Sequence, residues 1–181
     1  MQSILVNSAT YNEADNITTL LDEVAKNVVP FNKHNFEMFI IDDNSPDGTS
    51  SMVKEYAATH HFNNFKIRTI DRAGKEGYGK AYINGFAEVL KDPADFDYIL
   101  TIDADLQHNP KYIADFVGKA EQGFDFINAS RYIFGGVPNW KLSRKLLSIG
   151  GNMYTKLFLG SDITDYTGGY VMYSKWLLCF R

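Results

Sequence analysis

Cysteine is almost missing from this chain of 181 residues, which contains Cys179 alone. A single cysteine excludes an internal disulfide and is typical of proteins from a reducing compartment. The sequence also lacks any apolar run of the ~20 residues needed to span a bilayer, and its start lacks the basic region of a signal peptide. We therefore expect a cytoplasmic protein that contacts a membrane at most peripherally.

No single sign of charge dominates, because 18 basic and 22 acidic residues give a net charge of −4. This balance argues against a general nucleic-acid-binding protein. Apolar residues make up 45% of the chain, enough for one sizeable core, so we expect a single domain over residues 1–181. The apolar run Trp176–Phe180 reads as the start of a helix, so we expect this domain to lack its C-terminal end.

Segments typical of strands alternate with segments of helical periodicity. Strands are predicted at Ile4–Val6, Phe36–Ile41, Lys66–Ile70, Tyr98–Ile102 and Phe124–Ala129. Helices are predicted at Ile17–Val28, Thr49–His61, Ala81–Leu90 and Pro110–Gln122. This alternation predicts an α/β fold with a mostly parallel central sheet flanked by helices.

Polar clusters follow three of the predicted strands at the point where each strand ends. They are Tyr11–Glu13, Asp42–Asp43 and Asp103–Asp105. Open α/β sheets bind ligands outside the carboxyl ends of their strands. We therefore expect the three clusters to meet along one edge and to bind a ligand there.

The segment Asp103-Ala104-Asp105-Leu106-Gln107 places two carboxylates and an amide next to a strand end. Such oxygens are hard ligands suited to Mg²⁺ or Mn²⁺, and a bound cation can bridge a diphosphate. A D-x-D pattern alone is usually a turn or a helix cap, but the strand before it and Gln107–Pro110 after it favour a metal site. For His108 we favour a supporting role in the loop over direct metal ligation.

Asp43 follows the second strand, where its carboxylate can accept a hydrogen bond from a nucleobase. The alternative is a turn or cap, because Asn44–Gly48 consists of turn-forming residues. We expect Ser45 and Asp47 to be structural and Asp43 to face the ligand.

Two basic segments are candidates for binding phosphate. Lys75 and Lys80 lie in a glycine-bearing loop that leads into a helix, where they either contact a phosphate or are simply solvated. Farther along, basic residues gather around a tryptophan, at Arg131, Trp140, Lys141, Arg144 and Lys145. Arg144 and Ser148 are four residues apart on one helix face. Arginine binds phosphate bidentately, although a solvated charged face is the alternative.

Five segments, taken in order, resemble the inverting glycosyltransferases of the GT-A fold. They are Thr10–Glu13, Asp42–Thr49, Asp103–Pro110, Arg131–Tyr132 and Asp165–Tyr170. The S-P-D-G-T sequence and the spacing from Arg131 to Arg144 are most similar to the polyprenol-phosphate sugar synthases, which include the dolichyl-phosphate mannose synthases.

The resemblance implies a role for each matching residue. Tyr11, Glu13 and Asp43 would hold the nucleoside. Asp103, Asp105 and Gln107, with Ala104 between them, would surround the metal and the donor diphosphate. Arg131, Arg144 and Ser148 would hold an acceptor lipid phosphate, and Asp165, Thr167 and Gly168 would form the far wall of the cleft.

The function implied is transfer of mannose from GDP-mannose, with inversion, to a polyprenyl or dolichyl phosphate at the cytosolic face of a membrane. A phosphate with a second pKa near ~6 is already a dianionic nucleophile and needs no general base. Two alternatives remain. One is a transferase that uses a UDP-sugar and a saccharide hydroxyl, with Asp165 as the base, and the other is a non-catalytic subunit that binds nucleotide sugars.

The sequence departs from the family pattern at three places. Ala9 replaces a usual proline, and Asn44 replaces a frequent glycine in a turn that tolerates asparagine. Val171 stands where many relatives carry arginine, and Ser174 is also not basic. We therefore expect no basic clamp on the diphosphate from that end of the site.

Overall fold

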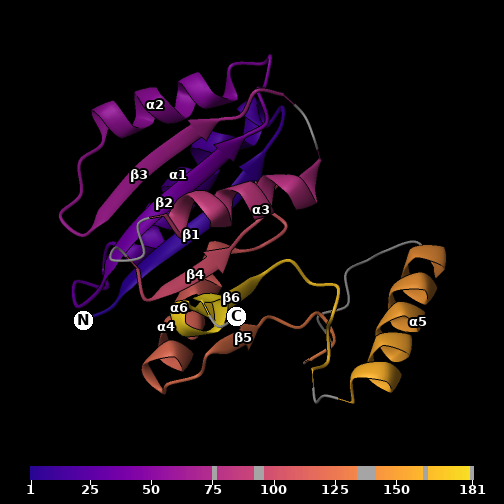
Figure 1. The fold of residues 1–181 in the computed structure, drawn as a ribbon. Helices are drawn as coiled ribbons and strands as arrows, with labels where there is room; N and C mark the ends of the chain where they lie inside the picture. Colours follow the sequence, from indigo (N-terminus) through magenta and orange to yellow (C-terminus); the bar gives the residue numbers. More distant parts are fainter. Residues whose placement is uncertain (75–76, 92–95, 134–141, 161–162, 180–181) are drawn as a thin grey trace.

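A six-stranded sheet forms the centre of the computed structural model (Figure 1), which describes residues 1–74, 77–91, 96–133, 142–160 and 163–179. The strands are β1 (Ser3–Thr10), β2 (Asn35–Asp42), β3 (Phe65–Asp71), β4 (Tyr98–Thr101), β5 (Phe126–Asn128) and β6 (Val171–Ser174). They lie in the order β3-β2-β1-β4-β6-β5. The pairs among β1 to β4 are parallel, and β6 is antiparallel to both of its neighbours. The predicted mostly parallel sheet is confirmed.

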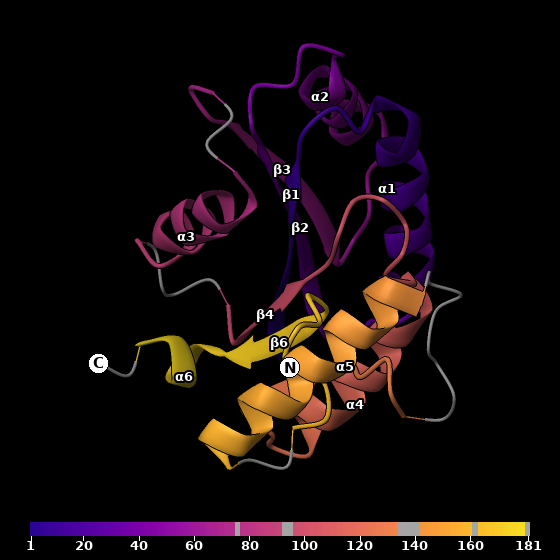
Figure 2. The ribbon, with the colours of Figure 1, turned by 90° about the vertical axis from the view of Figure 1, so that its right-hand side faces the viewer.

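Helices cover both faces of the sheet (Figure 2). The helices are α1 (Ala14–Val28), α2 (Thr49–Thr59), α3 (Tyr78–Val89), α4 (Ile113–Glu121), α5 (Leu142–Leu159) and α6 (Lys175–Cys179), with a 3-10 turn at Pro110–Tyr112. Alternate residues of a strand point to opposite faces. Val6 and Ile40 accordingly pack with α1, α2 and α4, whereas Leu5 and Ile41 pack with α3. Burial on both faces explains why these strands read as continuous apolar runs.

Helix α3 lies very close to the sheet at Gly85. A Cβ atom added there would lie 2.0 Å from Cδ1 of Ile41, which is fully buried. The missing side chain therefore permits this close contact between helix and sheet.

Strand β6 was not predicted from the sequence. It has four residues and lies between β4 and β5, with Val171 opposite Thr101. Because β6 runs antiparallel to β4, its first residue lies beside the last residue of β4. The preceding loop, residues 163–170, is thereby carried to the edge at which the acidic clusters lie.

Helix α5 stands apart from the sheet, on the side where the loops after β5 and before β6 lie (Figure 1). Large apolar side chains on it are exposed, with Leu147 and Leu157 each 81% exposed. None of the helices in the described ranges is long and apolar enough to cross a membrane.

Candidate active site

Hydrogen bonds join the loops that follow β1 and β2 at the carboxyl edge of the sheet. The backbone N–H of Asn12 donates to Ser45 Oγ at 3.0 Å, and that of Ala14 donates to Asp47 Oδ2 at 3.0 Å. Asp47 also accepts from Thr49. Ser45 and Asp47 are therefore structural, as predicted.

Neighbouring aspartates at the end of β2 have different partners. Asp42 is 1% exposed and accepts from Thr10 Oγ1 at 2.9 Å and from the Ser45 N–H at 2.7 Å. Asp43 forms an ion pair with Arg72, and the two side chains are 5% and 7% exposed. Contact between Asp43 and a nucleoside stays a prediction. The structure adds that the guanidinium of Arg72 lies beside the Asp43 carboxylate.

Arg72 was not found from the sequence. It follows β3, and its N–H donates to the carbonyl of Asp42 at 2.8 Å. The available signal was positional, because β3 is parallel to β2 and ends at the same edge. Only the strand order shows that these two strands are adjacent.

The other residues predicted to bind the donor also lie at this edge. Tyr11 is half-buried in the bend after β1. The carbonyl of Glu13 accepts from Asn16 and Ile17 and so opens α1, and its carboxylate accepts from Asn16 Nδ2 at 2.9 Å. Lys80 is exposed in the first turn of α3, and Lys75 lies outside the described residues.

The loop after β4 presents the two carboxylates of the D-x-D pattern. Ala104 between them is 4% exposed and packs into the core. Leu106 has a φ of 62°, a left-handed conformation that turns the chain back. Gln107 then donates to Asp105 from its backbone N–H at 3.0 Å and from Nε2 at 2.7 Å.

His108 contacts Asp103, the first of these two carboxylates. Its Nδ1 accepts from the Asp103 N–H at 3.0 Å, so the hydrogen must be on Nε2, which lies 3.4 Å from Asp103 Oδ2. The ring stacks on Tyr170 with centroids 5.0 Å apart. Burial lowers the pKa of His108 despite the opposing effect of Asp103 and Asp105. Both ring nitrogens face Asp103, which gives His108 a supporting role in the loop.

The donor set of this loop suits a hard cation. Across the described ranges, no group of three or more His, Cys, Asp or Glu side chains is arranged to hold a metal ion. Asp103 and Asp105 with the Gln107 amide provide a partial set of oxygen ligands. Mg²⁺ typically uses one or two carboxylates and completes its shell with water and phosphate oxygens. The residues fit Mg²⁺ or Mn²⁺ bound together with a diphosphate.

Arg131 and Asp165 form a bidentate ion pair, on loops separate from the one that carries Asp103 and Asp105. Arg131 Nε and Nη2 lie 2.7 and 2.8 Å from the two oxygens of Asp165, and the Arg131 N–H lies 3.2 Å from Oδ2. The Asp165 side chain is 0% exposed and that of Arg131 is 29% exposed. Burial by itself would raise the pKa of Asp165, but the hydrogen bonds from Arg131 outweigh it and lower that pKa. Asp165 is thus an ionised partner of Arg131.

Ser148 lies on α5 and its hydroxyl contacts that of Tyr132, the neighbour of Arg131. The side chain of Arg144 is outside the described part of the chain, as are Trp140 and Lys141. The predicted acceptor residues Arg131 and Ser148 therefore lie on adjoining elements, whereas the position of Arg144 is known only for its backbone in α5.

The departures noted in the sequence have structural counterparts. Asn44 has a φ of 58°, a conformation that asparagine adopts more readily than most residues. Val171 is 5% exposed and pairs with Thr101 in the sheet. The side chain at this position is thus apolar and packs within the sheet.

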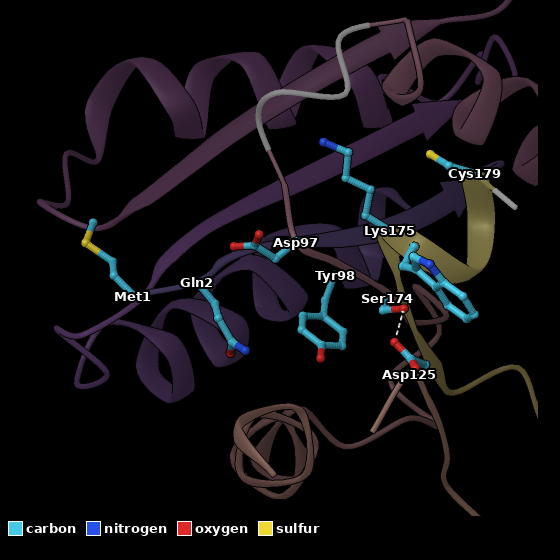
Figure 3. Close-up of a pocket in the computed structure, with 9 residues that line it drawn as sticks. Met1, Gln2, Asp97, Tyr98, Asp125, Ser174, Lys175 and Cys179 are labelled. Atoms are coloured by element: carbon cyan, nitrogen blue, oxygen red, sulfur yellow. Dashed lines mark hydrogen bonds between the residues drawn. The ribbon is translucent and has the colours of Figure 1, made fainter. Parts of the chain in front are cut away.

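A hollow of about 570 Å³ lies at the opposite, amino edge of the sheet (Figure 3). Asp97 and Asp125 line it, but Asp97 accepts from the Ser3 N–H at 2.8 Å and Asp125 from the Ser174 hydroxyl at 2.6 Å. Since these carboxylates are used to join chain segments, we place the candidate active site at the carboxyl edge.

Sequence comparison finds a match to Glycosyl transferase family 2 over residues 6–178. The chain is 32% identical over 178 residues to polyprenol monophosphomannose synthase of Mycolicibacterium smegmatis. The aligned region covers 98% of this chain and 63% of that protein. It is 33% identical over 165 residues to undecaprenyl-phosphate mannosyltransferase of Micrococcus luteus, covering 91% of this chain and 63% of that protein. The chain thus spans less than two thirds of the length of both relatives.

Solved structures share the fold. A mannosyltransferase of Pyrobaculum calidifontis in complex with GDP-mannose and Mn²⁺ matches 97% of this chain and 45% of its own, with a TM-score of 0.63 and 22% identity. Mannosyl-3-phosphoglycerate synthase of Rubrobacter xylanophilus matches 98% and 55%, with a TM-score of 0.72 and 16% identity.

Proposed function

Because the chain belongs to glycosyl transferase family 2, we propose that it transfers mannose from GDP-mannose, with inversion, to a polyprenyl phosphate. Two relatives at 32% and 33% identity have names that combine mannose with a polyprenyl phosphate. The Pyrobaculum neighbour binds GDP-mannose with Mn²⁺. The proposal treats residues 1–181 as a single catalytic domain.

The observation that carries the proposal is the state of Asp165. A saccharide hydroxyl must lose a proton during transfer and needs a carboxylate base, for which Asp165 was the candidate. Its carboxylate instead accepts hydrogen bonds from Arg131 and Thr167 and has a lowered pKa. A dianionic phosphate needs no base, so this arrangement favours a phosphate acceptor.

On the donor side, the proposal assigns the nucleoside to Tyr11, Glu13 and Asp43, and assigns a diphosphate contact to Lys80. Asp103, Asp105 and Gln107 would hold Mg²⁺ or Mn²⁺, with Ala104 between the two carboxylates. A cation held there would neutralise charge that develops on the departing nucleoside diphosphate.

The reaction is a single displacement. An oxygen of the acceptor phosphate forms a bond to the anomeric carbon, while the bond from that carbon to the donor phosphate breaks. The electron pair leaves with the nucleoside diphosphate, and no proton is transferred. Arg131, Arg144 and Ser148 would bind and orient the acceptor phosphate, so that catalysis depends on positioning and charge stabilisation.

Helix α5 provides the support for a peripheral membrane contact. Six exposed apolar side chains occupy about half of the helix circumference, at Leu147, Ile149, Met153, Tyr154, Leu157 and Phe158. Leu159, the last residue of α5, is also exposed but lies outside this half. Ser148 and Asn152 lie on the opposite side and bond to the rest of the protein. The helix has three basic and no acidic residues. An apolar face with basic residues suits a surface that contains anionic lipid.

The function is tested by incubating the protein with Mn²⁺ and a set of nucleotide sugars, with polyprenyl phosphate or free saccharides as acceptors. We expect lipid-linked mannose, detected by mass, from GDP-mannose and polyprenyl phosphate. Transfer to a free saccharide alone would favour the hydroxyl-acceptor enzyme, and donor binding without turnover would favour a non-catalytic subunit.

The membrane contact is tested by sedimentation with vesicles that contain anionic lipid. We expect Leu157→Asp to reduce the bound fraction at least about tenfold, because a charge in the apolar face must be desolvated. Ile83→Asp is the matched control, since Ile83 is 67% exposed on α3 and the change in charge is the same. Equal loss in both variants would refute the assignment to α5, and a dimer disrupted only by Leu157→Asp would assign the face to a second copy.

A further inference from the structure

Three polar side chains meet where α5 joins the loops around Arg131 and Asp165. They are Tyr132, Ser148 and Asn152. Asn152 is 8% exposed, although it lies on a helix whose other side is open to solvent. A buried amide on such a helix needs partners for each of its polar atoms, and the structure supplies them.

The orientation of the Asn152 amide follows from one contact. The backbone N–H of Tyr166 lies 2.6 Å from Asn152 Oδ1. A backbone N–H can only donate, so the atom that faces it must be the oxygen. Nδ2 then donates to Tyr132 Oη at 3.2 Å and to the Ser148 carbonyl at 3.0 Å.

This orientation indicates which hydroxyl donates in the contact between Tyr132 and Ser148. The hydrogen bond from Asn152 occupies an acceptor position of Tyr132 Oη, which favours Tyr132 as the donor toward Ser148 Oγ. Ser148 then acts as the acceptor in that contact, and its own hydrogen is left to donate to a third group.

We propose that Asn152 and Tyr132 are positioning residues that aim the Ser148 hydroxyl, as a hydrogen-bond donor, at the acceptor phosphate. This inference rests on the proposed function, in which Arg131 and Ser148 bind that phosphate. Nothing in the sequence pattern singled out Asn152 or Tyr132 for such a role.

The same contacts fix α5 relative to the ion pair across the site. Tyr132 follows Arg131 in the chain, and Tyr166 follows Asp165. Asn152 bonds to both Tyr132 and Tyr166 and so connects α5 to each half of the pair. One side chain thereby sets the distance between Ser148 and Arg131, the two groups proposed to grip the phosphate.

The test uses Asn152→Asp, which keeps the shape of the side chain. One carboxylate oxygen still accepts from the Tyr166 N–H. The other replaces Nδ2, so it accepts from Tyr132 and can no longer donate to Tyr132 or to the Ser148 carbonyl. Tyr132 no longer donates to Ser148, and Ser148 loses its free hydrogen. We expect the KM for polyprenyl phosphate to rise about tenfold or more, with the KM for GDP-mannose little changed. The Tm should fall, because the new carboxylate is buried and one of its oxygens faces the Ser148 carbonyl.

We call the hydrogen bonds from Asn152 to Tyr132 and from Tyr132 to Ser148 the relay. Tyr132→Phe removes both of them and should also raise the KM for polyprenyl phosphate. Thr155→Val is the matched control, because Thr155 is on the same helix and its hydroxyl donates within α5, to the Gly151 carbonyl at 2.9 Å. This variant should behave as the wild type.

An unchanged acceptor KM in Asn152→Asp and Tyr132→Phe would overturn the relay while leaving the proposed function intact. Equal rises in the KM for GDP-mannose and the KM for polyprenyl phosphate would also overturn it, because they would indicate a merely structural role. A wild-type protein that uses GDP-mannose but no polyprenyl phosphate would refute the proposed function, and the relay with it.

Discussion

Replacing Asp105 by alanine is expected to lower mannosyl transfer at least about a thousandfold. The lost stabilisation of the departing diphosphate amounts to several kcal/mol, and each ~1.4 kcal/mol is tenfold in rate. The variant should also lose Mn²⁺-dependent binding of a nucleoside diphosphate, measured by titration calorimetry. Asp105 is exposed, so stability should change little apart from its two contacts with Gln107.

The matched control for this prediction is Asp115→Ala, which removes an exposed carboxylate from the first turn of α4. Its transfer rate should stay within about twofold of the wild type, since surface substitutions typically have small effects. Normal turnover in the Asp105 variant would contradict the metal assignment. Loss of turnover with Mn²⁺ binding retained would give Asp105 a different role.

The second large effect is expected from the buried ion pair. Asp165→Ala leaves Arg131 without its carboxylate and should lower the free energy of unfolding by about 3 kcal/mol. Urea denaturation measures this loss directly. Since Arg131 is also proposed to hold the acceptor, transfer to polyprenyl phosphate should fall together with stability.

The pair also predicts how stability depends on pH. The pKa of Asp165 is lower in the folded protein than in the unfolded chain, so the pair stabilises fully above the ordinary carboxyl pKa of ~3.9. This contribution is lost as the pH falls through the folded pKa. Below about pH 4, Asp165→Asn should therefore show a flatter decline in stability than the wild type. A parallel decline would indicate that other carboxylates determine the acid sensitivity.

Arg131→Ala complements these variants because it removes the other partner. The buried carboxylate would remain without its guanidinium, so stability should fall here too. Binding of nucleoside diphosphate and Mn²⁺ by the folded fraction should persist, because Asp103 and Asp105 are on a separate loop. Loss of acceptor use with the donor site intact separates the two halves of the site.

The common position of the three acidic clusters could be predicted because its signals are local. Each acidic cluster directly follows an apolar strand, and parallel strands end at one edge. The turn residues Ser45, Asp47 and Asn44 likewise adopted the structural roles that their chemistry indicates. Short-range patterns of this kind record which element a residue belongs to and where that element ends.

The partners of the acidic side chains could not be predicted in the same way. Asp43 pairs with Arg72, which is 29 residues away in sequence, and Asp165 pairs with Arg131, which is 34 residues away. Which residues form such pairs depends on the order of the strands in the sheet. Whether a carboxylate is a free base or an ion-pair partner therefore depends on the tertiary structure.

The sequence by itself determined the α/β class, the edge of the sheet at which the acidic clusters meet and the hard-oxygen character of the Asp103–Gln107 loop. Periodicity and turn chemistry act over a few residues, which is why these features could be inferred from the chain alone. Only the tertiary structure decided that β6 lies between β4 and β5, that Asp165 is held by Arg131, and that α5 turns its polar side inward. Each of these depends on contacts between distant segments, and no local pattern encodes such contacts.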